Sequence, residues 1–136
     1  MSEPVSDLSA MLAGMEPQLH PSPYRFIMQN RADGAIAKFD HTFAVIRETE
    51  GTTFIVKSEE ASEAGDESPD FARITLAVHS ALDGVGLTAA VARGLADQGI
   101  PCNVIAAFHH DHLFVPWDRR EQALATLTAI AQDARR

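Results

Sequence analysis

The order of the expected elements in the second half of the chain restricts the fold most strongly. From residue 73 onward, the apolar residues alternate with a period of two in some segments and recur near 3.6 in others. This patterning predicts strand, helix, strand, strand and helix. In chain order, these elements span residues 73–78, 85–98, 103–108, 112–115 and 118 onward.

A β-α-β-β-α order lacks one strand of the split βαβ, or ferredoxin-like, unit. In that α+β fold, two helices cover one face of a four-stranded antiparallel sheet. An open sheet edge beside strand 73–78 would leave backbone N–H and C=O groups free to pair with another chain. We therefore expect a strand from the N-terminal part of the chain, or from a second copy, to complete this sheet. The two modules are then interdependent.

An acidic, turn-prone segment at residues 66–70, which includes Pro69, predicts the module boundary. We divide the chain into an N-terminal helix with a truncated module, residues 1–69, and a second module, residues 70–136. The first module is expected to begin with a helix over residues 8–15, capped by Ser6, followed by a strand over residues 24–28 and a turn-rich connection over residues 30–34. A hairpin of strands 43–48 and 53–57, with Glu50-Gly51 at its turn, comes next. A short helix capped by Ser58 ends the module.

Composition narrows the choice of partners and compartment. Eleven basic against nineteen acidic residues give a net charge of -8, which is the wrong sign for nucleic acid or an anionic membrane. Cys102 is the only cysteine, so no intramolecular disulfide can form. We find neither a secretory signal nor an apolar run of membrane-spanning length. The expectation is therefore a cytoplasmic protein.

A loop rich in glycine, residues 79–87, joins an expected strand to an expected helix. Gly84 and Gly86 allow a tight turn and expose backbone amides at the helix N-terminus, which favours an anion such as a carboxylate. Asp83 could hold an ammonium group, so the loop offers groups for both charges of an α-amino acid. In the alternative interpretation, the glycines are only turn residues and Asp83 is only a helix cap.

The run Asp83-Gly84-Val85-Gly86-Leu87, followed by Gly99-Ile100 and Asn103, resembles the pattern of ACT domains, the small-molecule-sensing modules of amino-acid metabolism. That pattern usually has proline where Val85 stands. Residues 79–80, 86–91, 102–104 and 111–116 are similar to a bacterial family of free-standing tandem ACT proteins, across nearly the whole chain. A fainter resemblance extends to the ACT halves of the animal cytosolic arginine sensor, whose ligand lies between ACT modules.

The resemblance implies a ligand site. The segment from Ser80 to Leu87 would face the ligand with its backbone, and Asp83 would be its acidic member. Asn103 would face the same edge, and Phe108 and Asp111 look like the aromatic and acidic pair of the arginine sensor. The candidate ligand-binding residues are Ser80, Asp83, Gly84, Val85, Gly86, Leu87, Asn103, Phe108 and Asp111. No cofactor is implied.

The run His109-His110-Asp111-His112 is the remaining cluster with possible chemistry. On a strand, His110 and His112 would lie on the same face, as two ligands of a zinc or copper ion must. They fall at an expected turn, however, and no further Cys or His has ligand spacing. We therefore expect a solvated turn, with His112 hydrogen-bonded and no metal bound.

No nucleophile has an obvious activating base. His79 is adjacent to Ser80, but neighbours on a strand point to opposite faces. Cys102 is expected to be a small buried hydrophobic residue. We therefore expect no catalytic residues.

These observations lead to three hypotheses. The first is a non-catalytic regulatory sensor that binds an amino acid or a related metabolite between ACT-like units, as a homodimer. The second is a ligand-free oligomerisation or docking module that uses the open sheet edge. The third is a protein that binds metal through the histidine turn.

Overall fold

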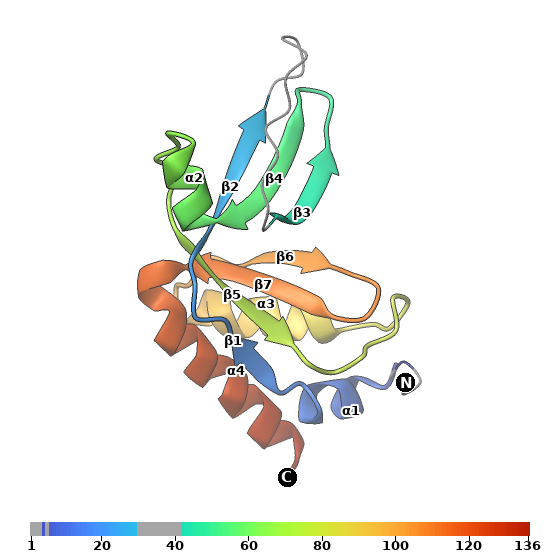
Figure 1. Ribbon diagram of the computed structural model, residues 1–136. Helices are drawn as coiled ribbons and strands as arrows, with labels where there is room; N and C mark the ends of the chain where they lie inside the picture. The colour runs from blue at the N-terminus through green and yellow to red at the C-terminus, as the bar shows by residue number, and fades with distance from the viewer. Residues whose placement is uncertain (1–3, 5, 30–41) are drawn as a thin grey trace. The chain divides into compact units, whose positions relative to one another are not determined.

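The computed structural model describes residue 4, residues 6–29 and residues 42–136 (Figure 1). The expected connection 30–34 lies outside the described residues. The contacts divide the chain into two compact units. The first contains the described residues up to Pro21 together with residues 72–136, and the second contains residues 22–71.

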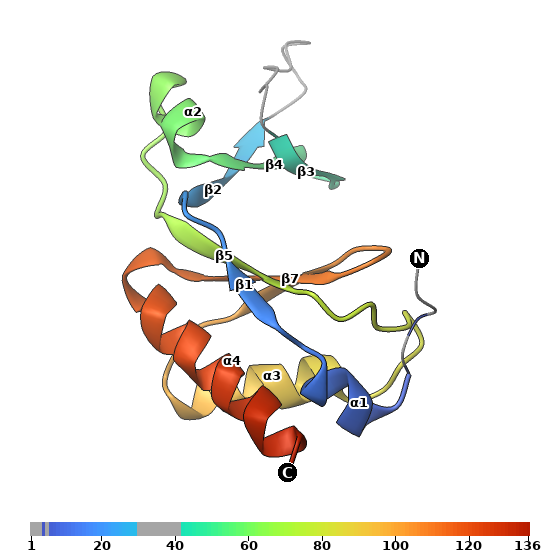
Figure 2. The same cartoon turned by 60° about the horizontal axis from the view of Figure 1, so that its bottom comes forward.

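The first unit has the ferredoxin-like arrangement predicted from the sequence. Its strands lie in the order β1-β5-β7-β6, and Figure 2 shows α3 and α4 on one face of this sheet. The elements are α1 (Leu8–Ala13), β1 (Pro17–Leu19), β5 (Phe71–Leu76), α3 (Leu87–Asp97), β6 (Asn103–Ala106), β7 (Asp111–Pro116), a 3-10 turn (Trp117–Arg119) and α4 (Arg120–Ala134).

The strand that completes this sheet comes from the N-terminal end of the chain. β1 pairs antiparallel with β5, with Pro17 opposite Leu76 and Leu19 opposite Ile74. The prediction of a completing strand is thus confirmed, with the strand supplied by the chain itself. The described residues up to Pro21 accordingly belong to the same compact unit as residues 72–136, whereas the sequence division placed them in the module 1–69.

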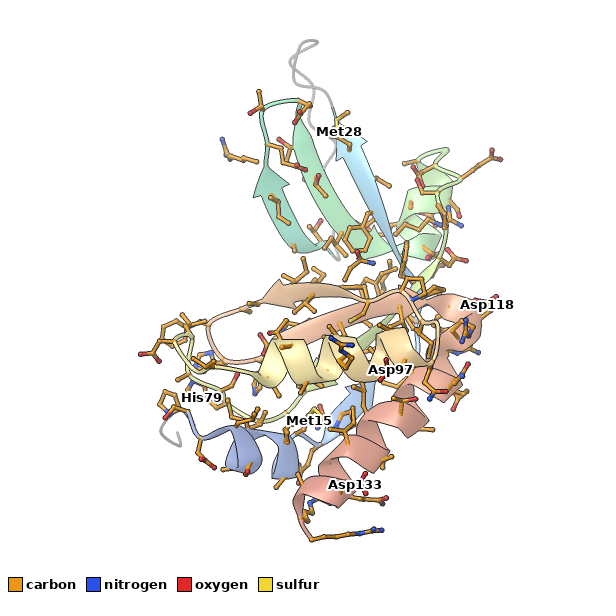
Figure 3. All side chains as sticks on the ribbon, turned by 180° about the vertical axis from the view of Figure 1, so that it is seen from behind. Met15, Met28, His79, Asp97, Asp118 and Asp133 are labelled. Atoms are coloured by element: carbon orange, nitrogen blue, oxygen red, sulfur yellow. The ribbon has the colours of Figure 1, made fainter. Side chains whose placement is uncertain are left out.

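The core of the first unit lies between the sheet and its helices. Ala72, Ile74 and Leu76 alternate along β5, and all three are buried on the face toward the helices. Met15, just after α1, belongs to the same core (Figure 3). Leu87, Val91 and Leu95 of α3, and Ala123, Leu127 and Ala131 of α4, complete it. The 3.6-residue spacing of these positions is what turns one face of each helix to the sheet.

The second unit is a three-stranded antiparallel sheet with one short helix. β2 (Tyr24–Gln29), β3 (Thr42–Arg47) and β4 (Thr52–Lys57) lie in the order β3-β4-β2, followed by α2 (Ser58–Glu63). The predicted hairpin is confirmed, since Glu48 and Gly51 exchange backbone hydrogen bonds at its turn. Its small core contains Ile27, Phe54, Val56 and Ala61.

The helix caps differ from those expected. Asp7, not Ser6, caps α1, because its carboxylate accepts a hydrogen bond of 2.9 Å from the backbone N–H of Ala10. Ser58 is the first residue of α2, and its side chain does not cap the helix. The 3-10 turn at residues 117–119 delays the start of α4 to Arg120, whereas the sequence predicted a helix from residue 118 onward.

Candidate functional site

The glycine loop leads directly into the longer helix α3. Gly86 is the N-cap residue, has φ of 107° and provides no side chain to cap the helix. The first helical hydrogen bond of α3 runs from the N–H of Ala90 to the carbonyl of Gly86. The amides of residues 87–89 therefore precede the helical hydrogen-bond pattern. The alternative interpretation made Asp83 a helix cap. In the structure Asp83 does not cap the helix, and its side chain is exposed.

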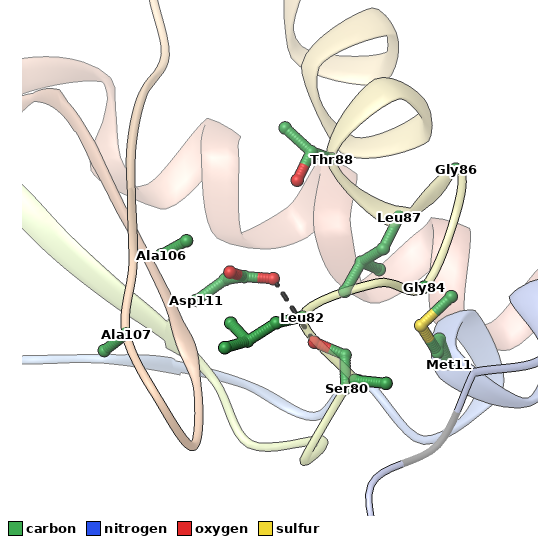
Figure 4. A pocket seen from close by; sticks show the side chains of 11 residues that line it. Met11, Ser80, Leu82, Gly84, Gly86, Leu87, Thr88, Ala106, Ala107 and Asp111 are labelled. Atoms are coloured by element: carbon green, nitrogen blue, oxygen red, sulfur yellow. Dashed lines mark hydrogen bonds between the residues drawn. The ribbon is translucent and has the colours of Figure 1, made fainter.

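A small pocket of about 130 Å³ lies beside this loop (Figure 4). Four parts of the first unit form it: α1, the glycine loop, the start of α3, and the β6–β7 hairpin. We call it the glycine-loop pocket. Its lining residues are Met11, Ser80, Ala81, Leu82, Gly84, Gly86, Leu87, Thr88, Ala106, Ala107 and Asp111.

Asp111, the first residue of β7, gives the glycine-loop pocket its charge. Burial raises the pKa of this carboxyl, while the Ser80 hydroxyl and nearby His110 act in the opposite direction. The Ser80 hydroxyl donates a long hydrogen bond of 3.5 Å to the carboxylate, drawn as a dashed line in Figure 4. Among the described residues that line the pocket, none has a basic side chain. A carboxylate in such surroundings favours a cationic guest.

The structure brings together five of the predicted site residues. Ser80, Gly84, Gly86, Leu87 and Asp111 all line the glycine-loop pocket. The fold thus brings the loop next to the hairpin, although Ser80 and Asp111 are 31 residues apart in the sequence.

Asp83 and Phe108 line a neighbouring, more apolar pocket of about 280 Å³, which we call the outer pocket. Ser80, Ala81 and Leu82 contribute to both pockets. The expected pairing of Phe108 with Asp111 is therefore split between two adjacent pockets.

Val85 and Asn103 line neither of these two pockets. Val85 is 82% exposed. Asn103 begins β6 and pairs with Phe114, at the end of the hairpin away from the Ala106–Asp111 pair. Its side-chain amide donates to the Phe114 carbonyl at 3.5 Å. Asn103, which was expected to face the same edge as the loop, therefore lies at the opposite end of the hairpin from Asp111.

Several lining residues were not among the predicted site residues. Met11 comes from α1, and in the sequence it is only one member of an apolar stripe. Leu82 and Thr88 flank the glycines, Ala106 is the last residue of β6, and Ala107 begins the hairpin turn. Thr88 is the second residue of α3, and its position directly after the glycine loop could have suggested it. No local sequence pattern indicates that Met11 lines a pocket.

The histidine turn is an aromatic cluster. The ring of His109 lies 5.1 Å from that of His79, 4.9 Å from Phe108 and 6.2 Å from His110, measured between centroids. His112 is buried, and its Nδ1 lies 2.9 Å from the Thr75 hydroxyl, so the predicted hydrogen bond of His112 is confirmed. Across the described ranges, no three His, Cys, Asp or Glu side chains are placed to hold a metal ion.

The candidate nucleophiles occupy different surroundings. Burial raises the pKa of Cys102 to about 11, so its thiol is protonated at neutral pH. The Ser80 hydroxyl donates its hydrogen bond to the carboxylate of Asp111.

Comparison with known families matches the chain twice to the ACT domain, over residues 3–73 and residues 70–129. The protein therefore belongs to the ACT-domain family and contains two ACT domains in tandem. ACT domains are regulatory modules that bind small molecules such as amino acids, so the family supports a regulatory, ligand-binding role. No functionally curated protein matches the chain.

Solved structures agree with this assignment. VC0802 of Vibrio cholerae, a protein of unknown function described as a possible transport protein, is 42% identical, with a TM-score of 0.77 over 91% of this chain and 95% of that one. Atu0741 of Agrobacterium tumefaciens has 16% identity and a TM-score of 0.69, over 85% and 87% of the two chains. The ligand-free regulatory subunit of aspartate kinase from Thermus thermophilus has 16% identity and a TM-score of 0.62, over 86% and 97%. The last two show the fold alone.

Within the part of the chain that the structure describes, no helix combines the length and hydrophobicity needed to cross a bilayer.

Proposed function

We propose that this protein is a non-catalytic cytoplasmic sensor that binds a small α-amino acid, or a closely related metabolite, in the glycine-loop pocket. One observation carries the proposal. The partly buried carboxylate of Asp111 and the uncapped amino end of α3 line the same pocket. The pocket therefore offers a negative group and hydrogen-bond donors to one guest.

The two ends of an amino acid match these groups. The ligand ammonium would donate charge-assisted hydrogen bonds to Asp111, with the Ser80 hydroxyl beside it. The ligand carboxylate would accept hydrogen bonds from the amides of Leu87 and Thr88, where the helix dipole favours negative charge. A bound ammonium would also offset the cost of burying the Asp111 carboxylate, because it favours the charged form.

The volume of the pocket limits the ligand. A cavity of about 150 Å³ in another protein holds benzene, so a pocket of about 130 Å³ suits roughly six to seven non-hydrogen atoms. Alanine and serine are of this size. Larger amino acids would have to extend toward the outer pocket or displace protein side chains.

The proposed readout is a change in association between copies of the chain, as a homodimer. Leu82, Val85 and Phe108 lie near the pocket, and they are 71%, 82% and 71% exposed. Apolar residues exposed together in this way mark association surfaces more often than isolated ones do. A second copy that covered them would also close the mouth of the pocket.

A ligand-free docking module remains the second candidate. The open sheet edge that suggested a docking module is not available beside β5, because β1 fills it. The exposed apolar residues around the pocket now support it instead. Light scattering with and without amino acids separates the two, since a docking module would associate equally in both conditions.

A thermal-shift panel of the twenty amino acids at millimolar concentration tests the proposal. A ligand present at 100 times its dissociation constant stabilises the native protein by about 2.7 kcal/mol. We expect the response to be confined to small amino acids. Asp111→Asn should abolish it, whereas Asp83→Asn, which removes the same charge from the outer pocket, should preserve it. A panel without any response, or an Asp111→Asn variant that responds like the wild type, would contradict the proposal.

A further inference from the structure

Helix α1 packs directly against the two glycines of the loop. A Cβ atom added to Gly84 would lie 3.3 Å from the Met11 sulfur, and one added to Gly86 would lie 3.0 Å from Cδ2 of Leu8. Real Cβ atoms seldom have contacts this short. The glycines therefore do more than turn the chain, because they also let Leu8 and Met11 approach the loop backbone.

This close approach makes the Met11 side chain one wall of the glycine-loop pocket. Met11 is only 1% exposed, and it is among the residues that line the pocket. In Figure 4, its thioether lies beside Gly84, on the side of the pocket away from Ala106 and Ala107. Asp111 stands nearer the alanines in this view, so the charged group and the thioether mark different ends of the pocket.

We propose that Met11 is the residue that determines ligand size in this pocket. The inference rests on the proposed function. With the ligand ammonium at Asp111 and its carboxylate at the start of α3, the ligand side chain would extend toward Met11. The atoms of Met11 beyond Cβ then fix the longest side chain that the pocket accepts.

Replacing Met11 with alanine would remove Cγ, Sδ and Cε and add their space to the pocket. An unbranched ligand chain could fill that space, and each newly buried methylene would strengthen binding about fourfold, corresponding to about 0.8 kcal/mol. Methionine is a flexible side chain, but in a packed core it gives way only at the expense of its other contacts.

The test is a ladder of ligands that share both charged groups and differ by single methylenes: alanine, 2-aminobutyrate, norvaline and norleucine. Affinities are measured by calorimetry on the full chain. The wild type should bind the short members best. Met11→Ala should move the optimum to the long members, with a norleucine-to-alanine affinity ratio at least tenfold above that of the wild type.

Met15→Ala is the matched control. Met15 is equally buried and belongs to the same core, but it does not line the pocket. It should lower stability without changing the order of the ladder. If Met11→Ala does not fold, Met11→Val makes a smaller truncation at the same position and should shift the optimum in the same direction.

The possible failures are distinguishable. Wild-type binding of short members, with an unshifted ladder in the folded Met11 variant, would overturn the role of Met11 and leave the proposed function intact. An equal shift in Met15→Ala would also overturn it, because the effect would then be a general loosening of the core. If neither the wild type nor the variants bind any member, the proposed function fails, and the role of Met11 fails with it.

Discussion

The Nδ1 atom of His112 lies 2.9 Å from the hydroxyl oxygen of Thr75, and both residues are buried. The same hydroxyl lies 2.8 Å from Nε2 of His20, so one threonine on β5 links a histidine after β1 with one on β7. Thr75 and His112 alternate with core residues of their strands, which places them on the sheet face away from the helices. The network therefore joins three parts of the chain that are distant in sequence.

This network should make the first unit less stable in mild acid. Burial, followed by the positive charges of Arg73, His110 and His20, lowers the pKa of His112 to about 4. Burial and Arg73 also lower the pKa of His20. Between pH 6.5 and about 4, the unfolded chain binds a proton at His112 that the folded chain does not, so stability falls as the pH falls. We expect a loss on the order of 1–3 kcal/mol, measured by urea unfolding across this range.

His112→Asn isolates this effect, because asparagine can hydrogen-bond Thr75 but does not titrate. Its stability should depend less on pH than that of the wild type between pH 6.5 and 4. His109→Asn changes an exposed histidine of the turn and should keep the wild-type slope. Equal slopes for the wild type and His112→Asn would contradict the assignment.

Gly86 should tolerate substitution worse than a glycine with a similar backbone but open surroundings. Gly86→Ala forces a residue with a side chain to φ of 107° and brings its Cβ within 3.0 Å of Leu8. In Gly99→Ala, the only unfavourable change is the positive φ of the new alanine, because nothing lies within 4 Å of its added Cβ. We expect Gly99→Ala to lose about 1–2 kcal/mol of unfolding free energy and Gly86→Ala to lose about 1–3 kcal/mol more.

Both glycine variants are measured by chemical denaturation. Only Gly86→Ala should also weaken the thermal shift by amino acids, since only Gly86 lines the glycine-loop pocket. Equal destabilisation of the two variants would show that the contact with Leu8 has no energetic weight.

The order of helices and strands along the second half of the chain could be predicted from the sequence, because hydrophobic periodicity and turn residues act locally. The completing strand could be predicted as necessary, but not located, because β1 is only three residues long, begins at Pro17 and is followed by Pro21 and Pro23. Some residues of the site could likewise be predicted from the sequence, and others could not. The glycines and Asp111 carry recognisable chemistry, whereas Met11 reaches the pocket only because α1 packs on the loop. Asn103 was suggested by the family pattern alone, and in the structure it begins β6, at the end of the hairpin away from the turn at residues 107–110.

Glu16, between α1 and β1, should be a position where glycine stabilises the protein. Among the described residues, it alone has a positive φ without being glycine, at 42°. The left-handed conformation costs a residue with a side chain about 1–2 kcal/mol, and glycine avoids that cost but loses about 0.5–1 kcal/mol through backbone entropy. Glu16→Gly should therefore gain up to about 1 kcal/mol in chemical denaturation. Glu16→Ala, which keeps Cβ, should gain nothing, and a gain equal to that of glycine would contradict strain as the cause.

Arg25 should stabilise the second unit through its hydrogen bonds more than through its charge. Its Nε donates to the Asp70 carboxylate at 2.7 Å, and its Nη1 donates to the backbone carbonyl of Asp66 at 2.6 Å. The hydrogen bond from Arg25 also lowers the pKa of Asp70. Arg25→Lys keeps the charge but cannot supply both donors in one fixed fork, so it should lose on the order of 1 kcal/mol of unfolding free energy.

Asp70→Asn should lose a similar amount at pH 7, whereas Glu67→Gln, which removes the same charge from a neighbouring exposed residue, should be close to neutral. Because the pKa of Asp70 is lowered in the folded state, its contribution is present at neutral pH and is lost as the pH falls below the ordinary range of aspartate. The difference between the wild type and Asp70→Asn should therefore shrink in acid. A difference that stays constant down to low pH would assign the effect to packing of the side chain rather than to its bond with Arg25.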